Sequence, residues 1–219
     1  MDQTPRLIEM LCSRICHDLV SPIGAINNGV ELLRELGEGG DQEAVNLIAH
    51  SAEQAAKRLT LMRLMYGAAG SDPVIGLKEV KKAAEEFFEG SRVAVEWNIN
   101  TAPPDLDGKK GLSKVILNLI IFIAEVIALN GVVKIGNTPE GAIRIEGLSQ
   151  SAALREHGIH IFNKDAKIAE MDTKLVHPLI TANFVTHFGF HVGNIMIDGK
   201  HIRLDLNQFE KINAKVMSR

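Results

Sequence analysis

The chain is poor in cysteine and in aromatic side chains, and it has no excess of basic charge. Its 219 residues include two cysteines, and its net charge is −3 at pH 7. Two cysteines cannot form a disulfide framework, which favours a reducing, cytoplasmic location. A nucleic-acid-binding protein usually carries a strong basic excess, so we expect no nucleic-acid partner.

Long hydrophobic runs are also missing. The longest apolar stretch, Val115 to Leu129, is interrupted by Asn118 and Glu125 and is too short to cross a bilayer. The first residues, MDQTPRLIEML, lack the basic and then apolar stretch of a secretory signal. We therefore expect a cytoplasmic protein without membrane contact.

The first 70 residues have the pattern of two helices. Apolar residues recur there at steps of three and four: Leu7, Leu11, Ile15, Leu19, Ile23, Ile26, Val30 and Leu33. Glycines in GEGG (37–40) end this helix, and a second helix begins at Asp41. The short connection predicts an antiparallel hairpin. Because two helices cannot bury such broad stripes alone, we expect a four-helix bundle formed by homodimerisation.

The remaining sequence mixes helical and strand patterns after a predicted linker, GAAGSDP (67–73). We predict a strand at 93–99, a buried helix at 111–130, a hairpin at 131–137 and 142–148, a helix at 173–189 interrupted near Pro178, and two strands joined by a DG turn within 191–206. The fold class is therefore α+β, with domains at 1–70 and 71–219, the second an α/β sandwich.

A histidine and a proline mark the first helix, in the string HDLVSP. His17 lies off the apolar stripe, and its neighbours at helical spacing are polar or small: Arg14, Asp18, Ser21, Gly24, Ala25 and Asn28. A neutral imidazole on that face can act as a nucleophile, although a lone histidine is more often only solvated. Pro22 removes a helix hydrogen bond at a cost of about 3 kcal/mol. We interpret this cost as shaping the surface around His17.

The string HDLVSP resembles the H-box of histidine-kinase dimerisation domains. With the wider strings LCSRICHDLVSPIGAINNGVELL and LTLMRLMYGAAGS, the chain resembles the ChpT-type histidine phosphotransferases of alphaproteobacterial phosphorelays. This resemblance implies a homodimer with a kinase-like hairpin and a C-terminal domain like a kinase ATPase domain that no longer binds ATP. It also implies receiver domains of a hybrid histidine kinase and of response regulators as partners.

The residues of a kinase nucleotide site are missing from the second domain. Phe122 stands where a kinase has a second asparagine after Asn118, there is no Asp-x-Gly-x-Gly string, and the late helix TKLVHPLITANFV has no glycine. A nucleotide site needs oxygen ligands for Mg²⁺ and glycines that let the backbone approach the phosphates. We therefore expect no autokinase activity and no resident cofactor, with Mg²⁺ supplied by the partner receiver.

The resemblance assigns roles to residues of the first helix. His17 would be the phosphoacceptor and Asp18 a supporting residue, although a solvated carboxylate is nearly as good a reading for Asp18. Receiver docking would involve Arg14, Ser21, Gly24, Ala25, Asn28 and, on the second helix, Arg63. Cys12, Cys16 and His17 are too crowded for a convincing metal site, so we expect none. Two alternatives stay open: a divergent autophosphorylating histidine kinase and a non-catalytic dimeric adaptor.

Overall fold

The chain divides into two compact units, Met1–Met62 and Arg63–Arg219. The computed structural model describes residues 4–36, 42–150, 154, 158–163 and 175–209. The predicted GEGG turn and the start at Asp41 lie outside the described residues. The boundary comes earlier than the one expected after residue 70, because Leu64 and Met65 are already buried in the second unit.

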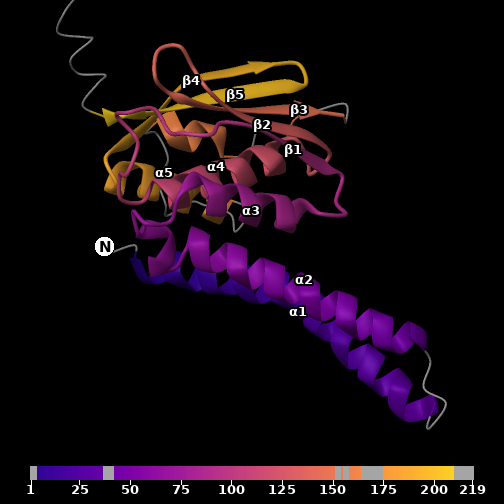
Figure 1. Cartoon of the computed structure of the whole chain (residues 1–219). Helices are drawn as coiled ribbons and strands as arrows, with labels where there is room; N and C mark the ends of the chain where they lie inside the picture. The colour runs from indigo at the N-terminus through magenta and orange to yellow at the C-terminus, as the bar shows by residue number, and fades with distance from the viewer. Residues whose placement is uncertain (1–3, 37–41, 151–153, 155–157, 164–174, 210–219) are drawn as a thin grey trace, which may run out of the picture. The chain divides into compact units, whose positions relative to one another are not determined.

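The first unit is a helical hairpin of α1 (Thr4–Leu36) and α2 (Gln42–Met65) up to Met62, as Figure 1 shows, and the last three residues of α2 belong to the second unit. The two helices are antiparallel, because a later residue of α1 contacts an earlier residue of α2. Asp18 accepts a hydrogen bond from Arg58, whereas Gly29 lies against Ile48. A Cβ atom at Gly29 would be 2.6 Å from Cγ1 of Ile48, so this glycine lets the helices approach closely. The predicted hairpin is therefore confirmed.

The predicted linker at 67–73 is wrong. Residues Ala68–Ser71 form a short 3₁₀ helix, η2, in which Gly70 is buried. A Cβ atom at Gly70 would be 1.7 Å from the carbonyl oxygen of Leu64, so a side chain cannot fit there. This segment is packed structure, and its small residues serve close packing.

The second unit contains a five-stranded sheet with the order β1-β2-β3-β5-β4. Its strands are β1 (Val93–Asn98), β2 (Gly131–Asn137), β3 (Ile143–Ser149), β4 (Phe190–Asp198) and β5 (His201–Gln208). β1 and β2 are parallel, because a helix connects them, whereas the other neighbours are antiparallel. The four strand regions predicted after residue 130 and the strand at 93–99 are all present.

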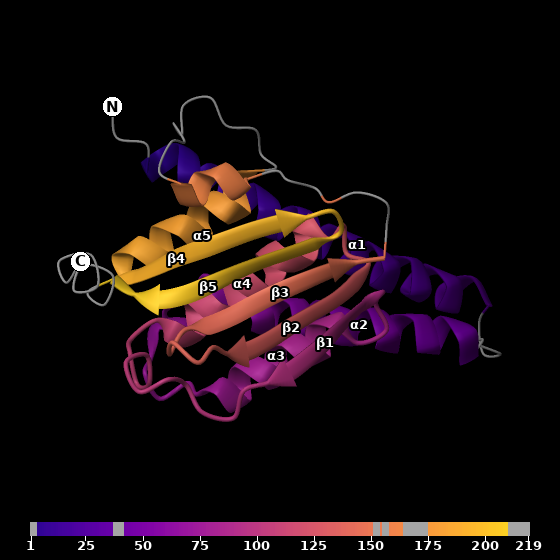
Figure 2. The same cartoon turned by 90° about the horizontal axis from the view of Figure 1, so that it is seen from above.

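Three helices pack on one face of this sheet, as Figures 1 and 2 show: α3 (Leu77–Phe88) against β1, α4 (Leu112–Val126) against β2 and β3, and α5 (Val176–His187) against β4. Every residue of α4 except Glu125 is buried, so α4 forms the centre of the core. The predicted α+β class, a helical hairpin followed by an α/β sandwich, is confirmed.

The expected interruption of the late helix near Pro178 is wrong. α5 begins at Val176, so Pro178 occupies its first turn. Backbone N–H groups in the first turn of a helix have no partner within that helix, and the missing N–H of proline therefore costs little there.

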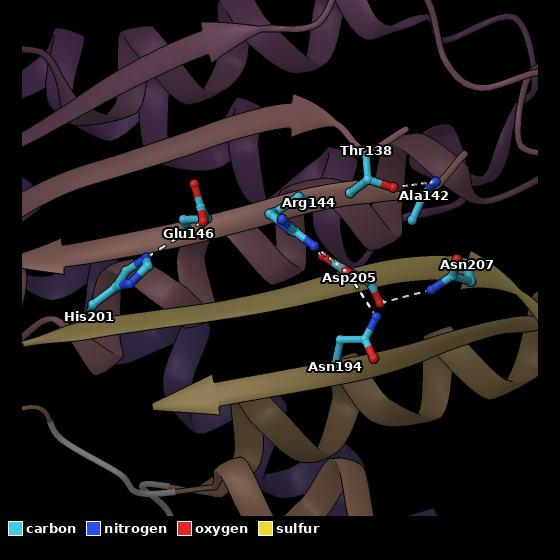
Figure 3. Close-up of polar contacts among 8 residues, drawn as sticks. All are labelled: Thr138, Ala142, Arg144, Glu146, Asn194, His201, Asp205 and Asn207. Atoms are coloured by element: carbon cyan, nitrogen blue, oxygen red, sulfur yellow. Dashed lines mark hydrogen bonds and ion pairs between the residues drawn. The ribbon is translucent and has the colours of Figure 1, made fainter. Parts of the chain in front are cut away.

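The opposite face of the sheet carries charged and polar side chains, and Figure 3 shows its central part. Neighbouring strands place Glu96, Lys134, Glu146 and Arg203 in one row of alternating charge. Beside this row, Arg144 makes a two-pronged contact with Asp205, at 2.7 and 2.9 Å. Edge strand β4 has a bulge between Gly193 and Met196, where Asn194 adopts a φ of 50°.

Candidate functional site

His17 projects from the middle of α1 with 88% of its side chain exposed. Its Nδ1 atom lies 3.3 Å from Oδ1 of Asp18. A carboxylate can only accept a hydrogen bond, so in a neutral ring this contact favours the tautomer with the proton on Nδ1 and the lone pair on Nε2. The ring is therefore accessible and has a free nucleophilic nitrogen.

Asp18 has contacts on both its side chain and its backbone. Its Oδ2 lies 3.9 Å from Nε of Arg14, one helical turn earlier. Its backbone carbonyl would normally accept a hydrogen bond from residue 22, but Pro22 has no N–H. Nη1 of Arg58, on α2, donates to this carbonyl at 3.4 Å. Asp18 therefore contacts Arg14 and His17 on α1 and Arg58 on α2.

The other residues predicted for docking on α1 share its surface with His17. Ser21 and Asn28 are exposed, and Gly24 and Ala25 are half-buried. A Cβ atom at Gly24 would meet nothing within 4 Å, so the helix surface is open there. Arg63 is exposed too, but it belongs to the second unit, and its place beside His17 stays a prediction. The same holds for the docking role of the whole set.

Sequence reasoning missed Arg58. The signal was present in part, because Pro22 predicts a carbonyl without its usual donor four residues earlier. What the sequence did not supply is the register of the two helices, which decides which α2 side chain reaches Asp18.

The helix that would hold a nucleotide in a kinase is α4, and its polar side chains are used inside the second unit. The Nδ2 atom of Asn118 donates to the carbonyls of Met65 and Lys114, at 3.0 and 2.8 Å. The rings of Phe122 and Phe162 pack with their centroids 5.0 Å apart. Asn118 therefore has a structural role, and Phe122 belongs to an aromatic contact.

No group of three or more histidine, cysteine, aspartate or glutamate side chains in the described ranges could hold a metal ion. Cys12 and Cys16 are both exposed and unlinked. No helix within the described part of the chain is both long and apolar enough to span a membrane.

Known proteins include a curated relative and a solved structure of substantial likeness. The protein phosphotransferase ChpT of Brucella abortus (strain 2308) is 39% identical over 140 residues, which cover 63% of this chain. The match spans 60% of that relative, less than two thirds of its length. A bacterial phosphotransferase structure superposes with a TM-score of 0.73 at 27% identity, over 94% of this chain and 98% of that chain.

A histidine kinase, AdeS of Acinetobacter baumannii, superposes with a TM-score of 0.49 at 14% identity, over 88% of this chain and 96% of that chain. The family model of the histidine phosphotransferase C-terminal domain matches residues 77–198, from α3 into β4. This match covers more than half of the 219 residues. The chain therefore belongs to the histidine phosphotransferase family.

Proposed function

We propose that this chain carries a phosphoryl group between receiver domains, using His17 as the phosphoacceptor. The observation that carries the proposal is the exposed imidazole of His17, with Nδ1 facing Asp18 and Nε2 directed away from it. Membership of the histidine phosphotransferase family supports it, as does the name of the Brucella relative.

In the proposed reaction, Nε2 of His17 attacks the phosphorus of an aspartyl phosphate on the receiver. The bond between phosphorus and the receiver's carboxylate oxygen breaks, and a bond between phosphorus and Nε2 forms. The positive charge that develops on the ring is offset by the carboxylate of Asp18, 3.3 Å from Nδ1. The reverse step delivers the group to a second receiver. Mg²⁺ would come with the receiver, so the chain itself needs no cofactor.

Receiver docking would use the surface of α1 on either side of His17. Small side chains let a helix of the receiver approach the imidazole closely, and Gly24 is the most open point of this surface. Phosphoryl transfer depends mainly on positioning, so a close and defined approach is what the chain must supply.

The proposal includes a homodimer formed through the hairpin. Four large apolar side chains of α1 are exposed: Ile8 by 55%, Val20 by 67%, Ile23 by 48% and Leu32 by 44%. On α2, Val45, Leu47 and Leu59 are exposed by 44%, 36% and 51%. Exposed apolar side chains on one hairpin indicate a protein interface. A second copy of the hairpin would bury them in a four-helix bundle.

We further propose that the chain does not phosphorylate itself with ATP. Two features support this: the amide nitrogen of the buried Asn118 is engaged by backbone carbonyls, and the aromatic ring of Phe122, packed on Phe162, stands in place of an asparagine. The kinase and adaptor alternatives are separated from the proposal by experiment.

The test uses receiver domains carrying a radiolabelled aspartyl phosphate, prepared with a labelled small-molecule phosphodonor and freed from it. We expect acid-labile, base-stable label on the wild type and on His50→Ala, which removes an exposed histidine of α2. We expect none on His17→Ala and none with ATP alone. Label from ATP would support the kinase. A folded wild type that takes no label from any receiver of its own genome would support the adaptor.

A further inference from the structure

We infer that Arg58 is a positioning residue for phosphotransfer: its guanidinium replaces the helix donor that Pro22 lacks, and it thereby fixes Asp18 and the ring of His17. This inference rests on the proposed function, because it concerns the rate at which His17 accepts the phosphoryl group. It adds a residue of α2 to a site otherwise built on α1.

The first step concerns the backbone of α1. This helix runs without interruption from Thr4 to Leu36, and Pro22 is buried inside it. The carbonyl of Asp18 therefore lacks the N–H that would close its helical hydrogen bond. Leaving such a carbonyl unpaired is unfavourable where water is excluded.

The second step concerns the donor. Arg58 is half-buried on α2, and its Nη1 donates to the carbonyl oxygen of Asp18 across the hairpin at 3.4 Å. Its Nε is buried and has no hydrogen-bond partner among the described residues. Partial burial of the guanidinium thus has a cost of its own. Any residue other than proline at position 22 would satisfy the same carbonyl without an arginine from the other helix.

The third step connects this carbonyl to the chemistry. Residue 18 carries both the carbonyl held by Arg58 and the carboxylate 3.3 Å from Nδ1 of His17. Fixing the backbone of Asp18 restricts where its carboxylate can lie and therefore how the imidazole is oriented. Catalytic groups need to be held within about 0.5 Å of their productive positions. The contact with Arg58 supplies such a restraint from α2.

The test is a double-mutant cycle on Pro22 and Arg58. Single-turnover phosphotransfer to the full chain is measured with increasing phosphorylated receiver, which separates the rate at saturation from receiver affinity. We expect Arg58→Met to lower the saturated rate about tenfold, because the imidazole is then held less firmly in its reactive orientation, with unchanged receiver affinity. Arg58→Lys keeps a donor and should recover part of the rate. Arg34→Met, an exposed arginine of α1, is the matched control and should behave as wild type.

The second arm replaces Pro22. In Pro22→Ala the backbone N–H of residue 22 can donate a hydrogen bond to the carbonyl of Asp18. Adding Arg58→Met to this variant should therefore lower the saturated rate less than twofold. The carbonyl carbon-13 resonance of Asp18 should likewise shift between wild type and Arg58→Met. It should shift much less between Pro22→Ala and the double variant. Equal losses of rate with and without Pro22 would overturn the inference, as would a full saturated rate in Arg58→Met. A wild type that accepts no phosphoryl group would instead remove the proposed function, and the inference with it.

Discussion

Lys114 places its ammonium nitrogen 2.6 Å from the carbonyl oxygen of Gly67 and 3.3 Å from that of Met65. Carbonyls at the end of a helix have no donor within it, and α2 ends at Met65. The ammonium also lies 4.6 Å from the centre of the Phe184 ring. A lysine that is 2% exposed thus satisfies backbone acceptors in the core of the second unit.

This burial predicts an unusual dependence of stability on pH. Burial lowers the pKa of Lys114 from 10.5 to about 8. Between these values the unfolded chain holds a proton that the folded chain has released, so the free energy of unfolding rises with pH. Relative to Lys114→Met, wild type should gain up to about 1.4 kcal/mol per pH unit above pH 8. Urea unfolding at pH 7.5, 8.5 and 9.5 measures this difference.

The control for these unfolding measurements is Lys78→Met, which removes an exposed lysine of α3. Its difference from wild type should not change over the same range of pH. A constant difference between wild type and Lys114→Met would contradict the prediction.

The pair formed by Arg144 and Asp205 predicts a large cost for removing the arginine. Burial would raise the pKa of Asp205, but hydrogen bonds from Arg144 and Asn194, with the guanidinium charge, lower it overall. Arg144→Met removes the cation that binds both oxygens of this buried carboxylate, and we expect a loss of about 3 kcal/mol in unfolding free energy at pH 7.

The lowered pKa of Asp205 also determines how the cost of Arg144→Met depends on pH. A lowered pKa stabilises the fold above the unfolded pKa of an aspartate, and this contribution is lost as the pH falls through the folded value. The difference between wild type and Arg144→Met should therefore shrink below about pH 4. Lys134→Met breaks the exposed pair with Glu96 on the same sheet face, and it should lower the free energy of unfolding much less than Arg144→Met does. Equal losses of unfolding free energy in Arg144→Met and Lys134→Met would contradict the prediction that the buried pair matters more.

Two glycines of α1 predict opposite effects of one methyl group. At Gly24 a Cβ atom meets nothing within 4 Å, so Gly24→Ala should stabilise the hairpin by about 0.5–1 kcal/mol. At Gly29 a Cβ atom would lie 2.6 Å from Cγ1 of Ile48, and Gly29→Ala should cost about 1–3 kcal/mol. Thermal unfolding measures both. If receivers dock over Gly24, its variant should also bind them more weakly, despite its higher stability.

The exposed apolar side chains of the hairpin predict a dimer that one charge can disrupt. Ile23→Glu places a carboxylate where the proposed four-helix bundle buries an isoleucine, and light scattering should then give the mass of a monomer. Val74→Glu changes an apolar side chain that is 83% exposed in the second unit, and it should leave the mass unchanged. A monomeric wild type would exclude the proposed dimer.

The fold could be predicted where apolar spacing was regular and turn residues were clear. Alternation placed β1, and TPEG and DG placed the two hairpins of the sheet. Helix α3 was not predicted, although its buried residues Val80, Ala83, Ala84 and Phe88 recur at helical spacing, so the sequence carried the signal for it. The segment at 67–73 misled because small residues suit both linkers and close packing, and only the contact of Gly70 with Leu64 distinguishes the two.

The candidate site could be predicted as far as it lies on one helix. His17, Asp18 and Pro22 are near neighbours in sequence, so helical geometry alone relates them. Arg58 lies on the other helix, α2. Its contact with the carbonyl of Asp18 depends on the register of the two helices, in which Gly29 lies against Ile48. Pairing between helices is a tertiary property that spacing along one segment does not encode.

The bulge in β4 affects how copies of this protein behave when they are crowded. A straight edge strand presents a row of unpaired amide and carbonyl groups that can recruit a strand from another molecule and start aggregation. In β4 this row is broken between Gly193 and Met196, where Asn194 turns into the left-handed region. Its side chain reaches back to Asp205 instead, at 2.9 Å. This edge of the sheet is thereby a poor template for sheet extension by a second molecule.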